Sequence, residues 1–271
     1  MLKRILSSIF LGIVVVLSAM YYPLCGFATS LLILIGLYEF FYMVEKKGVR
    51  LFKLFGIAVG LFIPISIFFH FSIKEGGQFL FAVLGLFSLF LLELTKKETH
   101  QAILSLSTTV FAIIYISWCF SFLIRIRQLQ EGALLLGFLI AVTKSSDIGA
   151  YLWGRAYGRT PLLARISPNK SLEGAVGGFF TSLVVGSIFS IFVTSIGPLE
   201  KFFLIIIIAI ISQLGDLFES LLKRDCQVKD SGRIFPGMGG VLDVIDSIIF
   251  TAPIFYLYVT MMKESITFPG M

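Results

Sequence analysis

The chain is dominated by long runs of apolar residues separated by short polar segments. A helix needs roughly 20 consecutive, mostly apolar residues to cross the hydrocarbon core of a bilayer. The pattern predicts about nine such helices, and therefore an all-α, polytopic transmembrane fold. We expect the spans near residues 5–22, 27–44, 51–71, 78–94, 103–124, 132–153, 173–194, 202–220 and 242–262.

The first of these ranges begins like a secretory signal peptide, because Lys3 and Arg4 precede an apolar run from Ile5 to Leu17. No clear small-x-small cleavage site follows the run, whereas many further spans do. We therefore expect this segment to be retained as a first helix.

Lysine and arginine are unevenly distributed between the two sets of loops, and positive charges favour the cytoplasmic side of a membrane. With a cytoplasmic amino terminus, 16 of the 22 basic residues fall on the cytoplasmic side and 5 on the other, while Lys144 lies within a span. The first set is Lys3, Arg4, Lys46, Lys47, Arg50, Lys53, Lys96, Lys97, Arg155, Arg159, Arg165, Lys170, Lys223, Arg224, Lys229 and Arg233, and the second is Lys74, Arg125, Arg127, Lys201 and Lys263. We predict a multi-pass protein of a bacterial inner membrane, with its amino terminus in the cytoplasm.

The composition excludes a soluble globular enzyme. Of the 271 residues, 57% are apolar and only 14% are charged, whereas about 25% of residues are charged in an average soluble domain. The net charge of +6 is typical of cytoplasmic loops rather than of a nucleic-acid-binding face, so we expect no nucleic-acid partner. Cys25, Cys119 and Cys226 are too far apart to form a metal or redox motif, and we assign them no role.

Ionisable side chains distinguish two parts of what we expect to be a single membrane domain over residues 1–271. Residues 1–140 are nearly bare of them and are expected to face lipid and to pack, with Glu39 and Glu93 reaching the membrane interface. Residues 141–262 carry six carboxylates within or at the ends of predicted spans, where carboxylates usually pair, bind ions or contact substrate. They are Asp147, Glu173, Asp216, Glu219, Asp243 and Asp246. Acids beside basic, glycine-rich loops indicate a metal–phosphate site at the cytoplasmic face.

Near the carboxyl terminus, acids stand on one face of each of two consecutive predicted helices. Asp216, Glu219 and Ser220 are spaced i, i+3 and i+4, while Asp243 and Asp246 are spaced i, i+3 on the next helix. The connecting loop returns the chain, so we expect the two faces to meet. Two aspartates from separate helices can hold Mg²⁺, which prefers carboxylate oxygens and retains water and phosphate ligands.

Cations and glycines lie at the end of the first helix and in the loop that follows. The cations can neutralise phosphate charge, and the glycines permit close backbone approach with N–H groups that can contact anions. The cations are Lys223, Arg224, Lys229 and Arg233, and the glycines are Gly237, Gly239 and Gly240. A tight cytoplasmic turn also explains the cations, but it does not explain acids on both flanking helices.

This stretch resembles the signature of the phosphatidate cytidylyltransferase (CDP-diacylglycerol synthase) family. The family pattern runs S-x-apolar-K-R, four residues, K-D-x-small, two residues, apolar-P-x-H-G-G-apolar-x-D-R-apolar-D. The matching positions are Ser220, Lys223, Arg224, Lys229, Asp230, Gly232, Phe235, Pro236, Gly239, Gly240, Asp243 and Asp246. The sequence departs from the pattern at Met238, where the family has His, and at Val244, where it has Arg.

A second block, residues 146–178, is similar to the family segments D-x-x-A-Y, G-R-x-x-G-R and S-P-x-K-[ST]-x-E-G-x-x-G-G. A structural interpretation also fits this block, with a helix capped by Ser171 and packed closely through its glycines. The resemblance favours nucleotide phosphate binding for its cations. These cations are Arg155, Arg159 and Lys170. The other residues of interest in the block are Asp147, Ser167, Ser171, Glu173, Gly174, Gly177 and Gly178.

The resemblance implies an enzyme of phospholipid biosynthesis that converts CTP and phosphatidate, a membrane lipid, to CDP-diacylglycerol and pyrophosphate. It implies Asp216 and Asp243 as Mg²⁺ ligands, a second cation such as K⁺ near Asp246 and Glu219, and a homodimer. The expected catalytic residues are Asp216, Asp243, Asp246 and Lys229. The expected substrate-binding residues are Asp147, Arg155, Ser167, Lys170, Glu173, Glu219, Ser220, Lys223, Arg224, Asp230, Gly239 and Gly240.

Three alternatives stay open at this point. A different lipid phosphotransferase, such as a polyprenol or phytol kinase, would share acidic clusters, although the long motif argues against it. A cation-coupled transporter would use the acids as an ion path, but transporter sites tend towards the bilayer midplane. An inactive homologue of the enzyme is suggested by Met238 and Val244.

Overall fold

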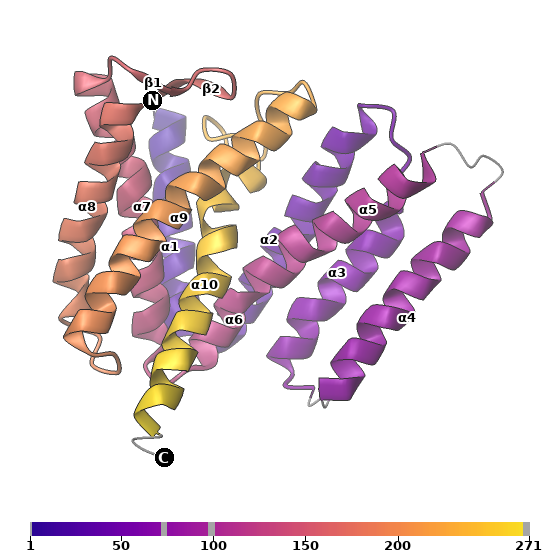
Figure 1. The fold of residues 1–271 in the computed structure, drawn as a ribbon, viewed down its shortest axis with the longest axis horizontal. Coiled ribbons are helices and arrows are strands. Elements are labelled where there is room, and N and C mark those ends of the chain that lie inside the picture. Colours follow the sequence, from indigo (N-terminus) through magenta and orange to yellow (C-terminus); the bar gives the residue numbers. More distant parts are fainter. Residues whose placement is uncertain (1, 72–74, 97–100, 268–271) are drawn as a thin grey trace.

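The computed structural model describes residues 2–71, 75–96 and 101–267, and helices account for most of them (Figure 1). The helices are α1 (Leu2–Met20), α2 (Tyr22–Glu45), α3 (Lys53–Phe68), α4 (Glu75–Leu94), α5 (Ala102–Ala112), η1 (Ile113–Trp118), α6 (Cys119–Gln128), α7 (Gly132–Tyr157), α8 (Leu172–Ser190), α9 (Pro198–Asp225) and α10 (Leu242–Thr267). Each predicted range coincides with one helical segment, because α5, η1 and α6 run on continuously. The helical fold class is therefore confirmed.

Within the described residues, six helical segments are long and apolar enough to cross a membrane. They are Tyr22–Glu45, Ala102–Gln128, Gly132–Tyr157, Leu172–Ser190, Pro198–Asp225 and Leu242–Met262, and shorter apolar helices occupy Ile9–Met20, Lys53–Phe68 and Leu80–Leu94. Large apolar side chains point outward, with Leu54 86% and Ile103 84% exposed. Such a surface is suited to lipid rather than to water. The polytopic architecture is confirmed, and the count of nine crossings stays a prediction.

α1 begins at one end of the bundle and α10 ends at the opposite end (Figure 1). An odd number of antiparallel crossings places the two ends of a chain on opposite sides in this way. Which end faces the cytoplasm stays a prediction. Two of the charges on which that prediction depends, Lys74 and Lys97, lie outside the described residues.

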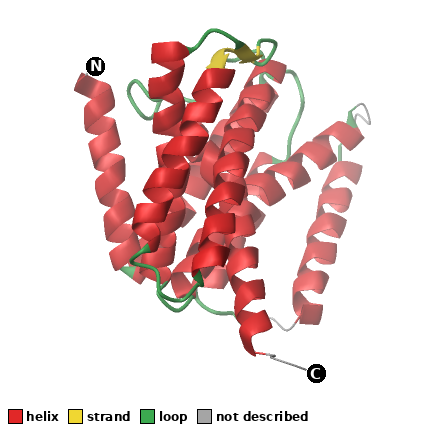
Figure 2. Cartoon of the chain, turned by 60° about the vertical axis from the view of Figure 1, so that its left-hand side comes forward, coloured by secondary structure: helices red, strands yellow, loops and turns green. Residues whose placement is uncertain are grey.

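A short hairpin that the apolar pattern did not predict connects α7 to α8. Strand β1 (Pro161–Leu163) pairs antiparallel with β2 (Ser167–Ser171) at the end of the bundle where α1 begins (Figure 2). The chain leaves α7 through Gly158, and Pro161 lacks the N–H group that a continuing helix needs. Strands this short leave no periodic signal in a sequence. We call this end of the bundle the hairpin end.

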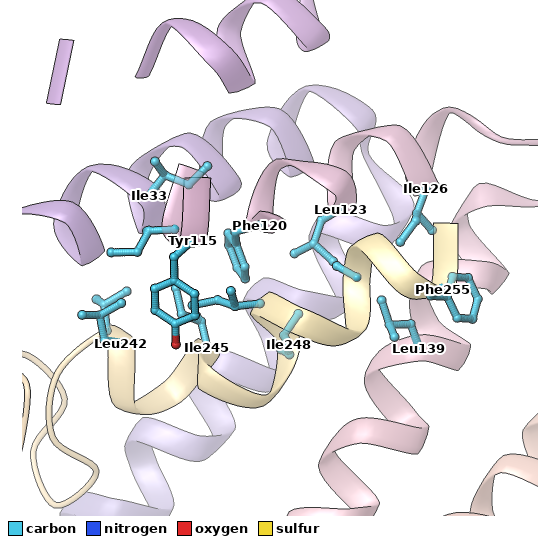
Figure 3. Close-up of a cluster of buried hydrophobic side chains, with 14 of the residues drawn as sticks. Ile33, Tyr115, Phe120, Leu123, Ile126, Leu139, Leu242, Ile245, Ile248 and Phe255 are labelled. Carbon is cyan, nitrogen blue, oxygen red and sulfur yellow. The ribbon is translucent and has the colours of Figure 1, made fainter. Parts of the chain in front are cut away.

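A buried apolar cluster joins the amino-terminal helices to α10. Figure 3 shows Ile33 of α2 and Phe120 of α6 on one side, with Ile245 and Ile248 of α10 on the other. The π-helical segment η1, which has a wider turn than an α-helix, leads into α6 and carries the buried Tyr115. The first turns of α10 are therefore supported by helices from the amino-terminal half.

At the end opposite the hairpin, Glu131 fastens the loop between α8 and α9. Its carboxylate accepts hydrogen bonds from the hydroxyl of Thr194, from Thr194 N at 2.9 Å and from Ser195 N at 3.0 Å. These bonds lower the pKa of Glu131 from 4.5 to about 2, and the bond from the Thr194 hydroxyl contributes most to the shift. Because the folded-state pKa is the lower one, this stabilisation is complete above the unfolded value and is lost as the pH falls towards 2.

Glu131→Gln is therefore expected to lower the melting temperature in detergent by about 2 °C at pH 7, and by less at pH 3. At the lower pH, most of the wild-type advantage is already lost through protonation. Thermal unfolding of both proteins, followed by fluorescence at the two pH values, measures the difference. An equal difference at both pH values would contradict the assignment.

Candidate functional site

The two motif blocks meet at an ion pair between β2 and α9. Lys170 Nζ lies 2.6 Å from Asp216 Oδ2. One turn earlier on α9, Gln213 Nε2 donates to the carbonyl of Ala175 in α8 at 2.9 Å. Residues that are far apart in the chain, and were predicted to share a site, are thus side by side.

A cavity of about 350 Å³ lies at this ion pair, between α7, α9 and the start of α8. Its polar lining residues are Asp147, Tyr151, Arg155, Asn169, Lys170, Ser171, Gln213 and Asp216. The cavity therefore offers cationic groups to an anion and carboxylate oxygens to a cation. Among the predicted substrate-binding residues, it brings together Asp147, Arg155 and Lys170.

Lys144 lies at the centre of a polar network between α7 and α10. Its Nζ is 3.0 Å from Asp147 Oδ2, from the hydroxyl of Ser247 and from the carbonyl of Val244. The Ser247 hydroxyl donates in turn to Asp147 Oδ2 at 3.1 Å. Sequence reasoning missed Lys144 and Ser247 as site residues. The signal was present for the lysine, since a cation inside an apolar range is costly unless it is paired.

Asp246 lies beside this network with 6% of its surface exposed. The charged groups that act on its carboxylate are Lys144 and Asp147 of α7 and Asp216 and Glu219 of α9. Among the described residues, no lysine or arginine forms an ion pair with Asp246. Within the described residues, Asp246 is therefore the one acid of the four predicted on α9 and α10 that forms no ion pair.

Lys223 joins the acids of α9 to those of α10. Its Nζ lies 2.5 Å from Asp243 Oδ1 and also contacts the carboxylate of Glu219, one turn before it on α9. This bridge confirms that the two acidic helix faces meet. The contact of Lys223 with a substrate phosphate stays a prediction, since its charge is here shared by two carboxylates.

Asp243 also holds the loop that precedes α10. Its Oδ2 accepts hydrogen bonds from Ser231 N and Gly240 N at 2.8 Å, and from the Ser231 hydroxyl at 2.9 Å. Gly239 has φ +103°, a conformation that favours glycine. The N–H group of Gly240 thus donates to the Asp243 carboxylate of the protein itself. Substrate contacts of Gly239 and Gly240 stay predictions.

Glu39 of α2 was expected to reach the membrane interface, but this expectation is wrong, because Glu39 is buried at this loop. Only 4% of it is exposed, and it accepts hydrogen bonds from Val241 N and Leu242 N at 3.0 Å each. The sequence shows that Glu39 lies near the end of a helix, but not that a loop from the other half of the chain covers that face. Glu93, which was also expected to reach the membrane interface, forms an ion pair with Lys96 at 2.9 Å.

The start of α8 confirms the structural interpretation of the second block. Ser171 caps the helix by accepting from Gly174 N at 3.1 Å, and Glu173 accepts from Arg159 N at 3.1 Å and from Thr160 N. The glycines lie against α7 so closely that a Cβ at Gly178 would be 2.7 Å from a carbonyl oxygen. Nucleotide binding by Glu173 stays a prediction beside these bonds to the backbone of the segment that follows α7.

The other predicted site residues are more dispersed. Arg224 donates to the carbonyls of Ile166 and Val228, and so connects α9 to the hairpin and to the loop. Ser167 lies in β2, Ser220 is buried in α9, and Lys229 and Asp230 are exposed in the loop. No contact between Lys229 or Asp230 and the four acids of α9 and α10 is seen in the described part of the chain.

The carboxylates match Mg²⁺ in chemical kind, because this ion prefers oxygen ligands. In the arrangement seen here, no three His, Cys, Asp or Glu side chains within the described residues are grouped so as to hold a metal ion. The predicted ligands Asp216 and Asp243 are instead paired with Lys170 and Lys223. A metal ion would have to take over carboxylate oxygens that lysines now neutralise, and the Mg²⁺ site stays a prediction.

Comparison with known proteins assigns the chain to a family. The model of the Cytidylyltransferase family matches residues 2–262. The chain is 33% identical over 267 residues to a phosphatidate cytidylyltransferase of Thermotoga maritima, covering 94% of both chains. It is 43% identical over 149 residues to a phosphatidate cytidylyltransferase of Bacillus subtilis, covering 54% of this chain and 55% of that protein. It is also 42% identical over 151 residues to the uncharacterized protein YnbB of Escherichia coli, covering 56% and 50%. The matched stretch thus spans about half the length of the last two relatives and nearly all of the first.

Proposed function

The chain belongs to the cytidylyltransferase family, and we propose that it transfers the cytidylyl group of CTP to phosphatidate. A phosphate oxygen of phosphatidate forms a bond to the α-phosphorus of CTP, and the bond from that phosphorus to pyrophosphate breaks. The products are CDP-diacylglycerol and pyrophosphate. The observation that carries this proposal is the Lys170–Asp216 pair, which joins the two motif blocks beside a charged cavity.

The main physical problem of this reaction is repulsion between two anionic substrates. The attacking phosphate oxygen is already negative, so no strong general base is needed to generate the nucleophile. Cationic groups directed at the phosphates lower the barrier by stabilising charge that builds up on the leaving pyrophosphate. Lys170 and Arg155 line the cavity and are the proposed phosphate ligands on the nucleotide side.

We propose Asp216 and Asp243 as the residues that hold Mg²⁺, whose charge would neutralise phosphate oxygens. Asp246 lies near Asp216 and, within the described residues, forms no ion pair with a lysine or arginine. It is therefore the proposed partner of this ion, or of a second cation such as K⁺, together with Glu219. Lys144 orients Asp147 and Ser247 beside these acids.

The location of the site is suited to substrates that come from two phases. We propose that the hairpin end faces the cytoplasm of a bacterial inner membrane, so that CTP reaches the cavity from water. Phosphatidate would stay in the adjoining leaflet with its acyl chains against the exposed apolar helix faces. A homodimer is a further proposal, taken from the family resemblance.

Pyrophosphate release by the purified protein in detergent tests the proposed function. We expect release only when phosphatidate, CTP and Mg²⁺ are all present, loss of release with EDTA, and a CDP-lipid product detected by mass spectrometry. Formation of a phosphorylated lipid and a nucleoside diphosphate from a polyprenol or phytol acceptor with ATP or CTP, without release of pyrophosphate, would indicate a lipid kinase instead. Absence of both pyrophosphate and nucleoside diphosphate formation from folded protein with every acceptor would favour an inactive homologue.

Met238→His, which restores the family residue, is expected to change the rate of pyrophosphate release by less than about twofold. Met238 lies in a tight turn in which its N–H group donates to the carbonyl of Phe235 at 3.0 Å, and this backbone bond does not depend on the side chain. Steady-state rates of the two proteins give the comparison. A rise of tenfold or more would show that the missing imidazole limits catalysis.

A further inference from the structure

The carboxylate of Glu39 comes from the amino-terminal half of the chain, yet it lies within the loop that supports the carboxyl-terminal acids. It accepts hydrogen bonds from three groups, namely Val241 N, Leu242 N and the Ser231 hydroxyl, each at 3.0 Å. The side chain is buried, so these bonds form away from bulk water. Hydrogen bonds to a buried charged group are among the stronger ones in proteins.

Two of these donors lie at the amino terminus of α10. The first N–H groups of a helix lack partners within the helix, and the helix dipole favours negative charge at that position. Glu39 meets both requirements from a different helix. Leu242 directly precedes Asp243, and Asp246 follows one turn later. The contact therefore fixes the backbone next to both acids of α10.

The third donor connects Glu39 to Asp243. The Ser231 hydroxyl lies 3.0 Å from Glu39 Oε2 and 2.9 Å from Asp243 Oδ2. A hydroxyl has a single proton to donate, so the two carboxylates share this donor. A substitution of Glu39 consequently alters the hydrogen bonding of Asp243 through Ser231, although Asp243 itself is unchanged.

Two glycines leave the space that Glu39 occupies. A Cβ atom at Gly232 or at Gly240 would collide with the carboxylate oxygens of Glu39, and at Gly240 also with the Ser231 hydroxyl. Both positions belong to the motif in the last segment. The buried glutamate thus supplies a steric reason for small residues at these two positions.

We propose that Glu39 is a positioning residue of the reaction, which sets Asp243 and Asp246 against the acids of α9 through the first turn of α10 and Ser231. This inference rests on the proposed function. It gives the amino-terminal half, which was expected only to face lipid and to pack, a direct part in the geometry of the site.

Glu39→Gln tests this role, because the amide keeps the size of the side chain but turns an NH₂ group towards N–H donors. We expect the kcat of pyrophosphate release to fall about 10- to 100-fold, while the KM for CTP stays within about threefold. The residues that line the cavity are not altered, so nucleotide binding is retained. Glu131→Gln is the matched control, since Glu131 also accepts N–H groups of a loop, at the opposite end of the bundle. Its kcat is expected to equal that of the wild type.

A double-mutant cycle with Ser231→Ala separates positioning from general stability. If both residues act through Asp243, the two losses in kcat are expected to be less than multiplicative in the double variant. Multiplicative losses, an unchanged kcat in Glu39→Gln, or an equal fall in kcat and rise in KM would each overturn the proposal.

Trypsin provides a readout that does not require activity, because Lys229 and Arg233 are exposed in the anchored loop. Glu39→Gln is expected to be cleaved there several-fold faster than the wild type, and Glu131→Gln at the wild-type rate. Equal rates in all three proteins would overturn the anchoring. A wild-type protein without turnover would contradict the proposed function instead, and the cleavage comparison would still test the anchor.

Discussion

Asp243→Asn is expected to lower the rate of Mg²⁺-dependent pyrophosphate release by about 100-fold or more, while the protein stays folded and inserted. The carboxylate receives Lys223 on one oxygen and two N–H groups on the other. An asparagine offers only one acceptor oxygen, removes the negative charge and places an NH₂ group against donors. Lys223 retains Glu219 as a partner, so the loss falls on the site. Steady-state assays in detergent, with size-exclusion chromatography as the test of folding, give the result.

Two companion variants make this experiment decisive. Asp246→Asn is expected to reduce the rate comparably, although no ion pair to Asp246 is lost within the described residues. Asp225→Asn is the control, because Asp225, at the end of α9, is likewise paired with a lysine, Lys47 at 2.6 Å, but is exposed and away from the cavity. An Asp243→Asn variant as active as Asp225→Asn would remove Asp243 from the metal site.

Lys170→Met is expected to lower kcat/KM for CTP by about 10- to 100-fold, since a hydrogen bond to a charged group contributes about 1.5–3 kcal/mol. Methionine keeps the unbranched shape of the side chain and removes only the ammonium group. That group pairs with Asp216 at the cavity and is the proposed phosphate ligand. Initial rates over a range of CTP concentrations, at saturating phosphatidate, measure the effect.

Lys201→Met is the matched control for this substitution. Lys201 donates to the carbonyls of Ser190 and Val193 at the end opposite the hairpin, far from the cavity lining. It is expected to retain wild-type kcat/KM. If Lys170→Met behaves in the same way, Lys170 neutralises Asp216 in the resting protein but does not contact the nucleotide.

The elements and the site were predictable from the sequence to different degrees. Long apolar runs predicted every helical segment, because burial in lipid acts on each segment separately. The spacing of Asp216, Glu219, Asp243 and Asp246 predicted two acidic helix faces, and the bridge through Lys223 confirms that they meet. The short β1–β2 hairpin left no such pattern.

The partners of each acid were not predictable in the same way. The sequence alone determined the helical membrane fold, the grouping of acids and cations in the last 130 or so residues, and the family resemblance. Only the tertiary structure decided that Lys170 pairs with Asp216, that Lys144 joins α7 to α10, and that Glu39 caps α10 from the other half of the chain. The physical reason is the separation along the chain between the residues that interact. Apolar periodicity and helix spacing are local properties, whereas a buried charge takes its partner from whichever element the packing of distant helices brings beside it.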